Sequence, residues 1–211
     1  AATAQPSKQE LFQPLPDGFI ATPQNDVEAL EALFAAQGDS ICAAMLEPIQ
    51  GESGVHPCTA EFMAAVRCLT AERGALLVCD EVQCGIYRTG KPFGFQNFGI
   101  VPDIVSIAKG VASGFPCGAC AARSEVAAAF NPGDHGSTFG GSCLAVAAAE
   151  ATLRELKAEN LAENAVEVGA YLRESLEALP GVESVRGIGL MLAADLKEDG
   201  KPAPDVVLEG L

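Results

Sequence analysis

The stretch PDIVSIAKG, residues 102–110, places a lysine at the end of a short apolar run. Ile104, Val105 and Ile107 give this run the composition of a buried strand in a parallel sheet. Lys109 follows the run, so its ammonium is either partly desolvated or extends past the sheet edge into water. Desolvation favours the neutral, nucleophilic amine. This run alone favours a Lys109 side chain that extends into water. The choice between the two alternatives therefore depends on the neighbouring segments.

Two earlier stretches repeat this pattern of a short apolar run that ends in an acid. SICAAMLEPI, residues 40–49, contains Glu47, and ALLVCDEV, residues 75–82, contains Asp80 and then Glu81. In a parallel sheet, ligands bind outside the carboxyl ends of the strands. We therefore expect Glu47, Asp80 and Lys109 to converge on one edge of a sheet.

One helix is predicted before the first run and another between the first and second runs. Asp26 is a candidate N-cap for a helix that stops near Gly38, and Thr59 is one for a helix that stops at Gly74. Strands that alternate with helices indicate an α/β fold with a largely parallel sheet.

The remaining segments lie on either side of this alternation. Residues 1–26 are expected to be irregular, and the glycine-rich loop GDHGSTFGGS leads into a helix that begins near Ser142. An amphipathic helix follows over residues 161–179. VRGIGLMLAADL, residues 185–196, is predicted as one strand preceded by a glycine bend, with a turn over residues 197–204.

The composition excludes several classes of partner. The net charge of −15 over 211 residues argues against nucleic acid and anionic membranes, which need clustered basic residues. No apolar run approaches a membrane span, and no secretory signal pattern opens the chain. We expect a soluble cytoplasmic protein that binds a small molecule or a protein. The eight cysteines are predicted to be free thiols, and the C-x-x-C pair Cys117 and Cys120 lacks the residues that would complete a metal site.

Asp80 and Lys109 together match the two chemical ends of pyridoxal 5'-phosphate. A lysine amine can form a Schiff base with the aldehyde, and a carboxylate can face the protonated pyridine nitrogen. The alternative for Asp80 is a cap on a following helix. HGSTFGG, residues 135–141, supplies Ser137, Thr138 and glycines for a phosphate, although such a stretch can also be only a tight turn.

The ordered motifs resemble those of the class III aminotransferases, which depend on pyridoxal phosphate, from about residue 41 to residue 195. These motifs are LEPIQGESGV, LLVCDEVQCGIYRTGK, PDIVSIAKG, GFPCGA, GDHGSTFGG and VRGIGLML. The resemblance implies the type I fold of these transferases, a mostly parallel sheet with helices on both faces. Residues 1–158 would be the second half of the large cofactor-binding domain. Residues 159–211 would begin a small α+β domain.

The resemblance also implies the roles of the residues that hold the cofactor. Lys109 would bind the aldehyde carbon and move the proton between substrate and cofactor, while Asp80 would pair with the pyridine nitrogen. Gln83 would donate a hydrogen bond to the phenolic oxygen, and Val82 would pack on one face of the ring. Thr138, with Ser137 beside it, would reach the phosphate in the partner subunit, which implies a homodimer with a shared active site.

Two glutamates are implied near the substrate. Glu52 resembles the family's gate glutamate, which pairs with a substrate-binding arginine when that arginine is idle. Glu47 would be a carboxylate near Gln83. Ile86 and Tyr87 depart from the family's smaller residues, and we expect them to adjust packing or the mouth of the site.

The reaction implied is transfer of the amino group of N-acetylornithine, or of a similar terminal amine, to 2-oxoglutarate in arginine biosynthesis. Ornithine, 4-aminobutyrate or succinyl-diaminopimelate transamination, or an aminomutase reaction, remains an alternative. We expect the chain to be a fragment, because the family's glycine-hydroxyl phosphate loop, its stacking aromatic ring and its carboxylate-binding arginine have no counterpart in it. A non-catalytic truncated product is the alternative from another class.

Overall fold

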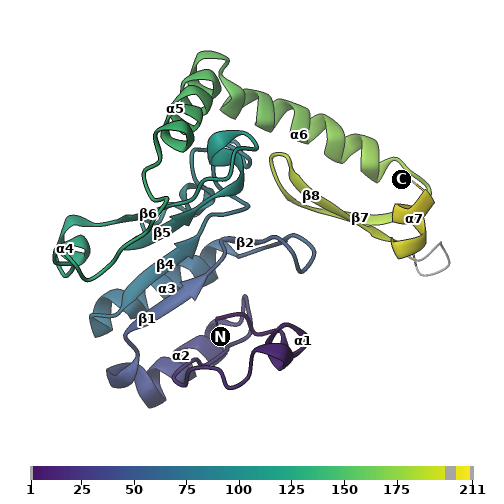
Figure 1. Ribbon diagram of the computed structural model, residues 1–211. Coiled ribbons are helices and arrows are strands. Elements are labelled where there is room, and N and C mark those ends of the chain that lie inside the picture. The colour runs from purple at the N-terminus through teal and green to yellow at the C-terminus, as the bar shows by residue number, and fades with distance from the viewer. Residues whose placement is uncertain (1, 198–202, 210–211) are drawn as a thin grey trace.

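A four-stranded sheet forms the centre of the molecule (Figure 1). The computed structural model describes residues 2–197 and 203–209. The sheet contains β1 (Ala43–Leu46), β4 (Leu76–Asp80), β5 (Ile104–Ile107) and β6 (Ala119–Ala122), in the order β1-β4-β5-β6. β1, β4 and β5 are parallel, as the three apolar runs predicted. β6 is antiparallel to β5 and was not predicted.

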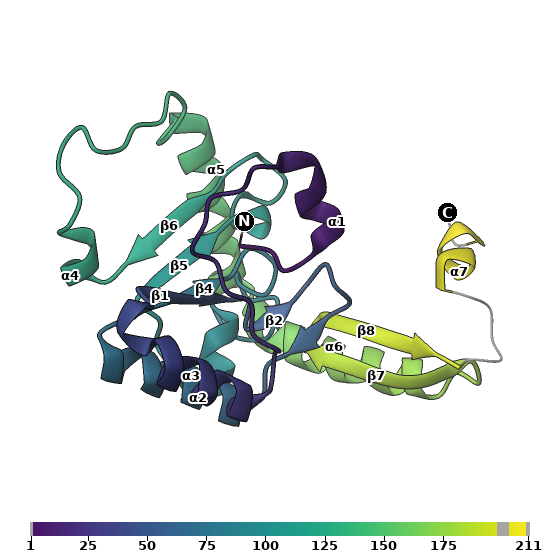
Figure 2. The ribbon, with the colours of Figure 1, turned by 90° about the horizontal axis from the view of Figure 1, so that it is seen from below.

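Two capped helices cover one face of the sheet. α2 (Val27–Gln37) begins after Asp26, whose carboxylate accepts the N–H of Ala29 at 2.9 Å. α3 (Ala60–Arg73) begins after Thr59 and ends at Gly74, which adopts φ 66°. Figure 2 shows both helices on the same side of the sheet, with the N-terminal segment on the other. Both predicted caps are therefore confirmed.

The main hydrophobic core lies between these helices and the sheet. Alternate residues of the strands point into it, as the period of two in a strand requires. Its buried members include Leu30, Phe34, Phe62, Met63, Val66, Leu77, Cys79, Phe95, Ile100 and Val105. The residues between them on β4 and β5 face away from α2 and α3, toward the side where the acids and the lysine were predicted to meet.

The C-terminal part extends away from the sheet (Figure 1). It contains α5 (Cys143–Ala158), α6 (Leu161–Glu177) and a hairpin of β7 (Val182–Ile188) and β8 (Met191–Leu196). The prediction of one strand here is wrong, because the chain turns at residues 189–190 and pairs with itself. Gly187, at φ 119°, approaches the backbone of Met191 too closely for any side chain.

The other elements are short. They are α1 (Pro6–Gln9), η1 (Glu10–Phe12), η2 (Gly38–Ser40), β2 (Ile49–Gln50), β3 (His56–Pro57), η3 (Gly94–Phe98), η4 (Lys109–Ala112), α4 (Ser124–Ala127) and α7 (Ala203–Glu209). The irregular entry predicted for residues 1–26 is thus wrong over residues 6–12. The turn predicted for residues 197–204 falls mostly outside the described residues. Within the described ranges, no helix is both long and apolar enough to cross a membrane.

Asp103 ties the sheet to its surroundings from just before β5. Its side chain is only 7% exposed and accepts from the N–H of Leu77 at 2.8 Å, from Arg67 Nη1 at 2.8 Å and from Arg123 Nη1 at 3.2 Å. Burial acts to raise the pKa of Asp103, but the hydrogen bonds from Leu77, Arg67 and Arg123 outweigh it and hold that pKa below 3.8. A buried carboxylate therefore joins β4, β5, α3 and the segment after β6.

Replacing Asp103 with alanine is expected to lower the free energy of unfolding by about 3 kcal/mol, because the buried N–H of Leu77 and the guanidinium of Arg67 lose their acceptor. Because the folded-state pKa lies below the unfolded value, this stabilisation is present above about pH 4 and is lost as the pH falls through the folded-state pKa. Urea unfolding of the whole protein as a function of pH measures the effect. Asp17→Ala, at an exposed position, is the control. A difference between Asp103→Ala and the parent that does not shrink on acidification would contradict the assignment.

Candidate active site

The carboxyl ends of the parallel strands lie side by side, so the residues that follow them share one edge of the sheet. Glu47 comes directly after β1, Asp80 ends β4, and Lys109 lies two residues after β5. Strand pairing sets Asp80 beside Ser106 of β5. The predicted convergence of strand ends is therefore present in the fold.

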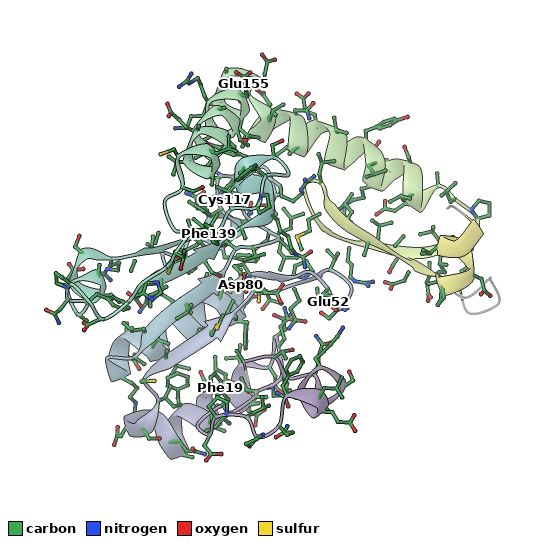
Figure 3. All side chains as sticks on the ribbon, viewed as in Figure 1. Phe19, Glu52, Asp80, Cys117, Phe139 and Glu155 are labelled. Atoms are coloured by element: carbon green, nitrogen blue, oxygen red, sulfur yellow. The ribbon has the colours of Figure 1, made fainter. Side chains whose placement is uncertain are left out.

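Asp80 is half-buried and belongs to a tight turn. Its Oδ1 accepts the N–H of Val82 at 3.0 Å. Turns and bends occupy residues 82–93, so the alternative in which Asp80 caps a following helix is wrong. Because Cys79 points into the core, Asp80 points to the opposite face, away from α2 and α3. Figure 3 shows it near the centre of the molecule.

Ser106 is a polar residue of the site that the sequence reasoning missed. Its neighbour Val105 points into the core, so Ser106 shares the outer face with Asp80, its partner across the strands. Its Oγ is buried and has no hydrogen-bond partner among the described residues. An unpaired buried hydroxyl costs free energy, and such groups are rare in folded proteins. The only sequence signal was that Ser106 is a polar residue within the apolar run of residues 104–107.

Lys109 is exposed, so the expectation of a partly desolvated amine is wrong for the described chain. β5 stops at Ile107, and Ala108 continues in an extended conformation before η4 begins. Lys109 opens η4 at φ 48°, a conformation that non-glycine residues seldom adopt. The strand thus ends early enough for the side chain to extend beyond the sheet edge. Next to Lys109, a Cβ added to Gly110 would lie 3.8 Å from the side chain of Ile86.

Glu47 and Gln83 are linked through one glycine. Oε2 of Glu47 accepts the N–H of Gly51 at 2.8 Å. Gly51 in turn lies so close to the side-chain amide of Gln83 that a Cβ would collide with it. The side chains of Glu47 and Gln83 therefore both contact Gly51, although the two residues are far apart in the sequence. Val82, which precedes Gln83, is held by its N–H to Asp80.

Glu52 lies on the loop between β2 and β3 (Figure 3). Its side chain is 67% exposed and pairs with Lys8 Nζ at 2.9 Å. The hydrogen bond and charge of Lys8 lower the pKa of Glu52, and the charge of Lys109 acts in the same direction. The charge of Lys109 thus acts on the Glu52 carboxylate, although Glu52 lies on the loop between β2 and β3 and Lys109 opens η4.

Ser137 and Thr138 lie on the exposed segment between α4 and α5. Figure 2 shows this segment looping out beyond β6. Ser137 Oγ accepts the N–H of Gly140 at 3.0 Å, which supports the turn in the loop. In the described part of the chain, no hydrogen bond connects Ser137 or Thr138 to Asp80, Gln83 or Lys109. These two hydroxyls are therefore not tied to the group at the strand ends by any hydrogen bond among the described residues.

Glu81 shapes the loop that follows Asp80. It is fully buried and accepts the N–H groups of Gly94 at 2.7 Å and Phe95 at 2.8 Å. Burial raises the pKa of Glu81 despite these bonds. Cys84 Sγ also donates to it at 3.3 Å. The sequence shows that Glu81 follows Asp80. It does not show that Glu81 anchors residues 94–95, because those contacts form only in the folded chain.

The cysteines do not form a second chemical site. All eight are free thiols, and Cys58, Cys79 and Cys84 are buried. Burial raises the pKa of Cys79 to about 12 and also raises that of Cys84, which makes both unreactive. Within residues 2–197 and 203–209, no cluster of three or more His, Cys, Asp and Glu residues could hold a metal ion.

Comparisons with known proteins agree with this geometry. The model of the aminotransferase class-III family matches residues 1–211. An acetylornithine aminotransferase from Bacillus subtilis is 46% identical over 212 residues, covering 99% of this chain and 54% of that protein. The chain spans about half the length of the curated relatives it matches.

Solved structures agree as well. An ornithine aminotransferase from Toxoplasma gondii, with partial occupancy of pyridoxal phosphate at its active site, is similar with a TM-score of 0.89 at 34% identity, covering 97% of this chain and 49% of that one. An acetylornithine aminotransferase from Elizabethkingia anophelis has a TM-score of 0.84 at 37% identity, covering 90% of this chain and 49% of that one.

Proposed function

Because the chain belongs to the aminotransferase class-III family, we propose that the whole protein is a transaminase that uses pyridoxal 5'-phosphate. Its fold is the α/β type I fold predicted from the sequence. The observation that carries the proposal is the position of Asp80 and Lys109 at the carboxyl ends of adjacent parallel strands. These two side chains suit opposite ends of the same cofactor.

The residues present fit this cofactor chemically. Lys109 offers an accessible amine, and Asp80 keeps a carboxylate on the outer face with one hydrogen bond from Val82. The buried, unpaired hydroxyl of Ser106 lies on the same face and would gain a partner from a polar group there. Gln83, which packs against Gly51, supplies an amide donor for the phenolic oxygen.

Each residue then has a defined task. Pyridoxal phosphate, when bound, supplies an aldehyde carbon and an electron-withdrawing ring that stabilises negative charge on the substrate carbon. Lys109 Nζ would hold that aldehyde carbon, and the same amine would take and return the substrate proton. The Asp80 carboxylate would keep a proton on the ring nitrogen. Val82 would cover one face of the ring.

For the substrates, we propose N-acetylornithine or a similar terminal amine as donor and 2-oxoglutarate as acceptor, a step of arginine biosynthesis. The acetylornithine aminotransferases among the relatives support this choice. Ornithine is the second candidate donor, favoured by the similarity to ornithine aminotransferase structures. Glu52 would pair with the arginine that binds the substrate carboxylate when that arginine is idle. Glu47 would hold the loop by accepting the N–H of Gly51.

For the assembly, we propose a cytoplasmic homodimer. The exposure of Ser137 and Thr138, which make no hydrogen bond to Asp80 or Lys109 in the described chain, supports a phosphate contact in the partner subunit. We also propose that residues 1–158 belong to the large cofactor-binding domain and residues 159–211 to the small domain. The extension of α6 and the hairpin away from the sheet supports this boundary (Figure 1).

The proposed function is tested by assaying the purified whole protein with a panel of amine donors and 2-oxoglutarate. We expect a yellow protein with ping-pong kinetics, and kcat/KM for N-acetylornithine at least about tenfold above that for ornithine, 4-aminobutyrate or succinyl-diaminopimelate, since unmatched polar groups in a substrate pocket cost about this much. A higher value for ornithine would favour the second candidate. A colourless, inactive whole protein would support the non-catalytic alternative.

A further inference from the structure

Arg186 connects the C-terminal hairpin to the loop that carries Glu52. It lies on β7, is 27% exposed, and its Nε donates to the carbonyl oxygen of Gly54 at 2.8 Å. Its Nη1 pairs with Asp195 on β8. Asp195 also accepts from Ser184 Oγ at 2.8 Å, so the guanidinium is held in place by the hairpin itself. The Arg186 side chain, fixed by the hairpin, thus donates to the carbonyl of Gly54, which is far away in the sequence.

The loop it holds, residues 51–55, has an unfavourable backbone. Gly54 adopts φ 119° and Val55 adopts φ 59°. A β-branched residue in the left-handed region is strained, and such strain persists only where surrounding contacts over-determine it. The contacts here include Glu47 on the N–H of Gly51 at the start of the loop and Arg186 on Gly54 at its end. Within the loop, Ser53 Oγ donates to Gln50 Oε1 at 3.1 Å, and its carbonyl oxygen lies 3.2 Å from His56 Nε2.

Glu52 lies between these two fixed points. Its side-chain partner in the described chain is Lys8, on an exposed ion pair, and such pairs fix geometry weakly. The direction of the Glu52 carboxylate therefore depends on how the backbone of the loop is held. The N–H groups of Gly54 and Val55 both donate to the carbonyl of Gly51, at 3.2 and 3.3 Å. These bonds close the loop around Glu52, so a shift in the backbone of Gly54 also shifts Glu52.

We propose that Arg186 is a positioning residue for Glu52: by holding the Gly54 carbonyl, it sets the loop conformation in which Glu52 discriminates between donor substrates. This inference rests on the proposed function, in which Glu52 acts at the substrate. An arginine suits this task because its planar guanidinium can donate to a carbonyl and a carboxylate simultaneously.

The test compares Arg186→Met, Arg186→Lys and Glu52→Gln, and the double variant of Arg186→Met with Glu52→Gln, in the whole protein. The readout is the ratio of kcat/KM for N-acetylornithine to that for glutamate, a dicarboxylate donor. We expect Arg186→Met to lower this ratio about tenfold, as a small misplacement of a positioned group does. Arg186→Lys should restore part of the ratio. In the Glu52→Gln background, Arg186→Met should change it no further.

Arg173→Met is the matched control. Arg173 on α6 donates to the carbonyls of Val185 and Gly187 on β7, at 2.6 and 2.8 Å, and among the described residues no hydrogen bond or ion pair joins it to the 51–55 loop. It should lower the melting temperature and leave the substrate ratio unchanged. Equal shifts in both arginine variants, or an Arg186→Met effect of the same size with and without Glu52, would mean that the hairpin only stabilises the fold and would overturn the proposal.

Hydrogen exchange separates this inference from the proposed function. The amides of Gly54 and Val55 should exchange at least about tenfold faster in Arg186→Met than in the parent, because their bonds to Gly51 open more often. Unchanged exchange rates in Arg186→Met would refute the positioning role of Arg186, whatever transaminase activity that variant shows. A parent protein without transaminase activity would refute the proposed function, and hydrogen exchange alone would then test whether Arg186 holds the loop.

Discussion

Replacing Lys109 with alanine is expected to reduce turnover of the whole protein by at least about 10⁴-fold, because the same amine holds the cofactor and moves the substrate proton. Loss of one general base alone costs about 10²- to 10⁴-fold, and loss of the covalent attachment adds to it. The purified variant should also fail to bind the cofactor covalently. Borohydride reduction followed by peptide mass analysis measures attachment at Lys109, and a coupled glutamate assay measures turnover.

Lys91→Ala is the control for this prediction. Lys91 is also an exposed lysine, on the irregular segment between β4 and η3, and its Nζ donates to the carbonyl of Gln96 at 3.0 Å. Its loss should leave both attachment and turnover within about threefold of the parent, as for most surface substitutions. Ping-pong turnover that survives in Lys109→Ala, or a cofactor trapped on another lysine, would remove Lys109 from its proposed role.

The central part of the fold could be predicted because its signals are local. A cap residue and the helix it starts are neighbours in sequence, so Asp26 and Thr59 marked α2 and α3 correctly. The short apolar runs of β1, β4 and β5 likewise carry the signature of a buried parallel strand. Once these strands are parallel, the meeting of Asp80 with the residues after β5 follows from topology.

The two elements that were missed have different physical origins. β6, with alanines at three of its four positions, lacks the β-branched residues that mark a strand and forms by pairing with β5. The β7–β8 hairpin looked like one strand because its turn at Gly189 interrupts a continuous apolar run. The pairing of β6 depends on a partner strand outside its own window, whereas the hairpin depends on where one short window turns, which its apolar composition did not indicate.

The site was predictable in its residue types and less so in its environment. Lys109 was expected to be desolvated because it follows a buried strand, but the extended Ala108 moves it past the sheet edge. The unpaired hydroxyl of Ser106 becomes visible only when strand register sets it beside Asp80. The bond from Arg186 to Gly54 joins residues 132 positions apart, beyond any pattern of spacing.

Replacing Asp80 with asparagine is expected to lower kcat about 10²- to 10³-fold while leaving the covalent attachment to Lys109 intact. An amide cannot keep a proton on the ring nitrogen as a carboxylate does, and removal of one preorganised electrostatic partner costs about this factor. The amide oxygen can still accept the N–H of Val82, now 3.0 Å from Oδ1, so the turn should persist. Single-turnover rates with N-acetylornithine measure the effect.

A second substitution separates chemistry from folding at this position. Asp80→Ala removes both the charge and the acceptor for Val82, and should lower the free energy of unfolding by about 1 kcal/mol relative to Asp80→Asn, the usual cost of one lost hydrogen bond. Its kcat should nevertheless match that of Asp80→Asn, because both lack the charge that faces the ring nitrogen. If Asp80→Asn retained the parental kcat, or if activity followed stability across the two variants, Asp80 would be a turn residue and the electrostatic role would belong elsewhere.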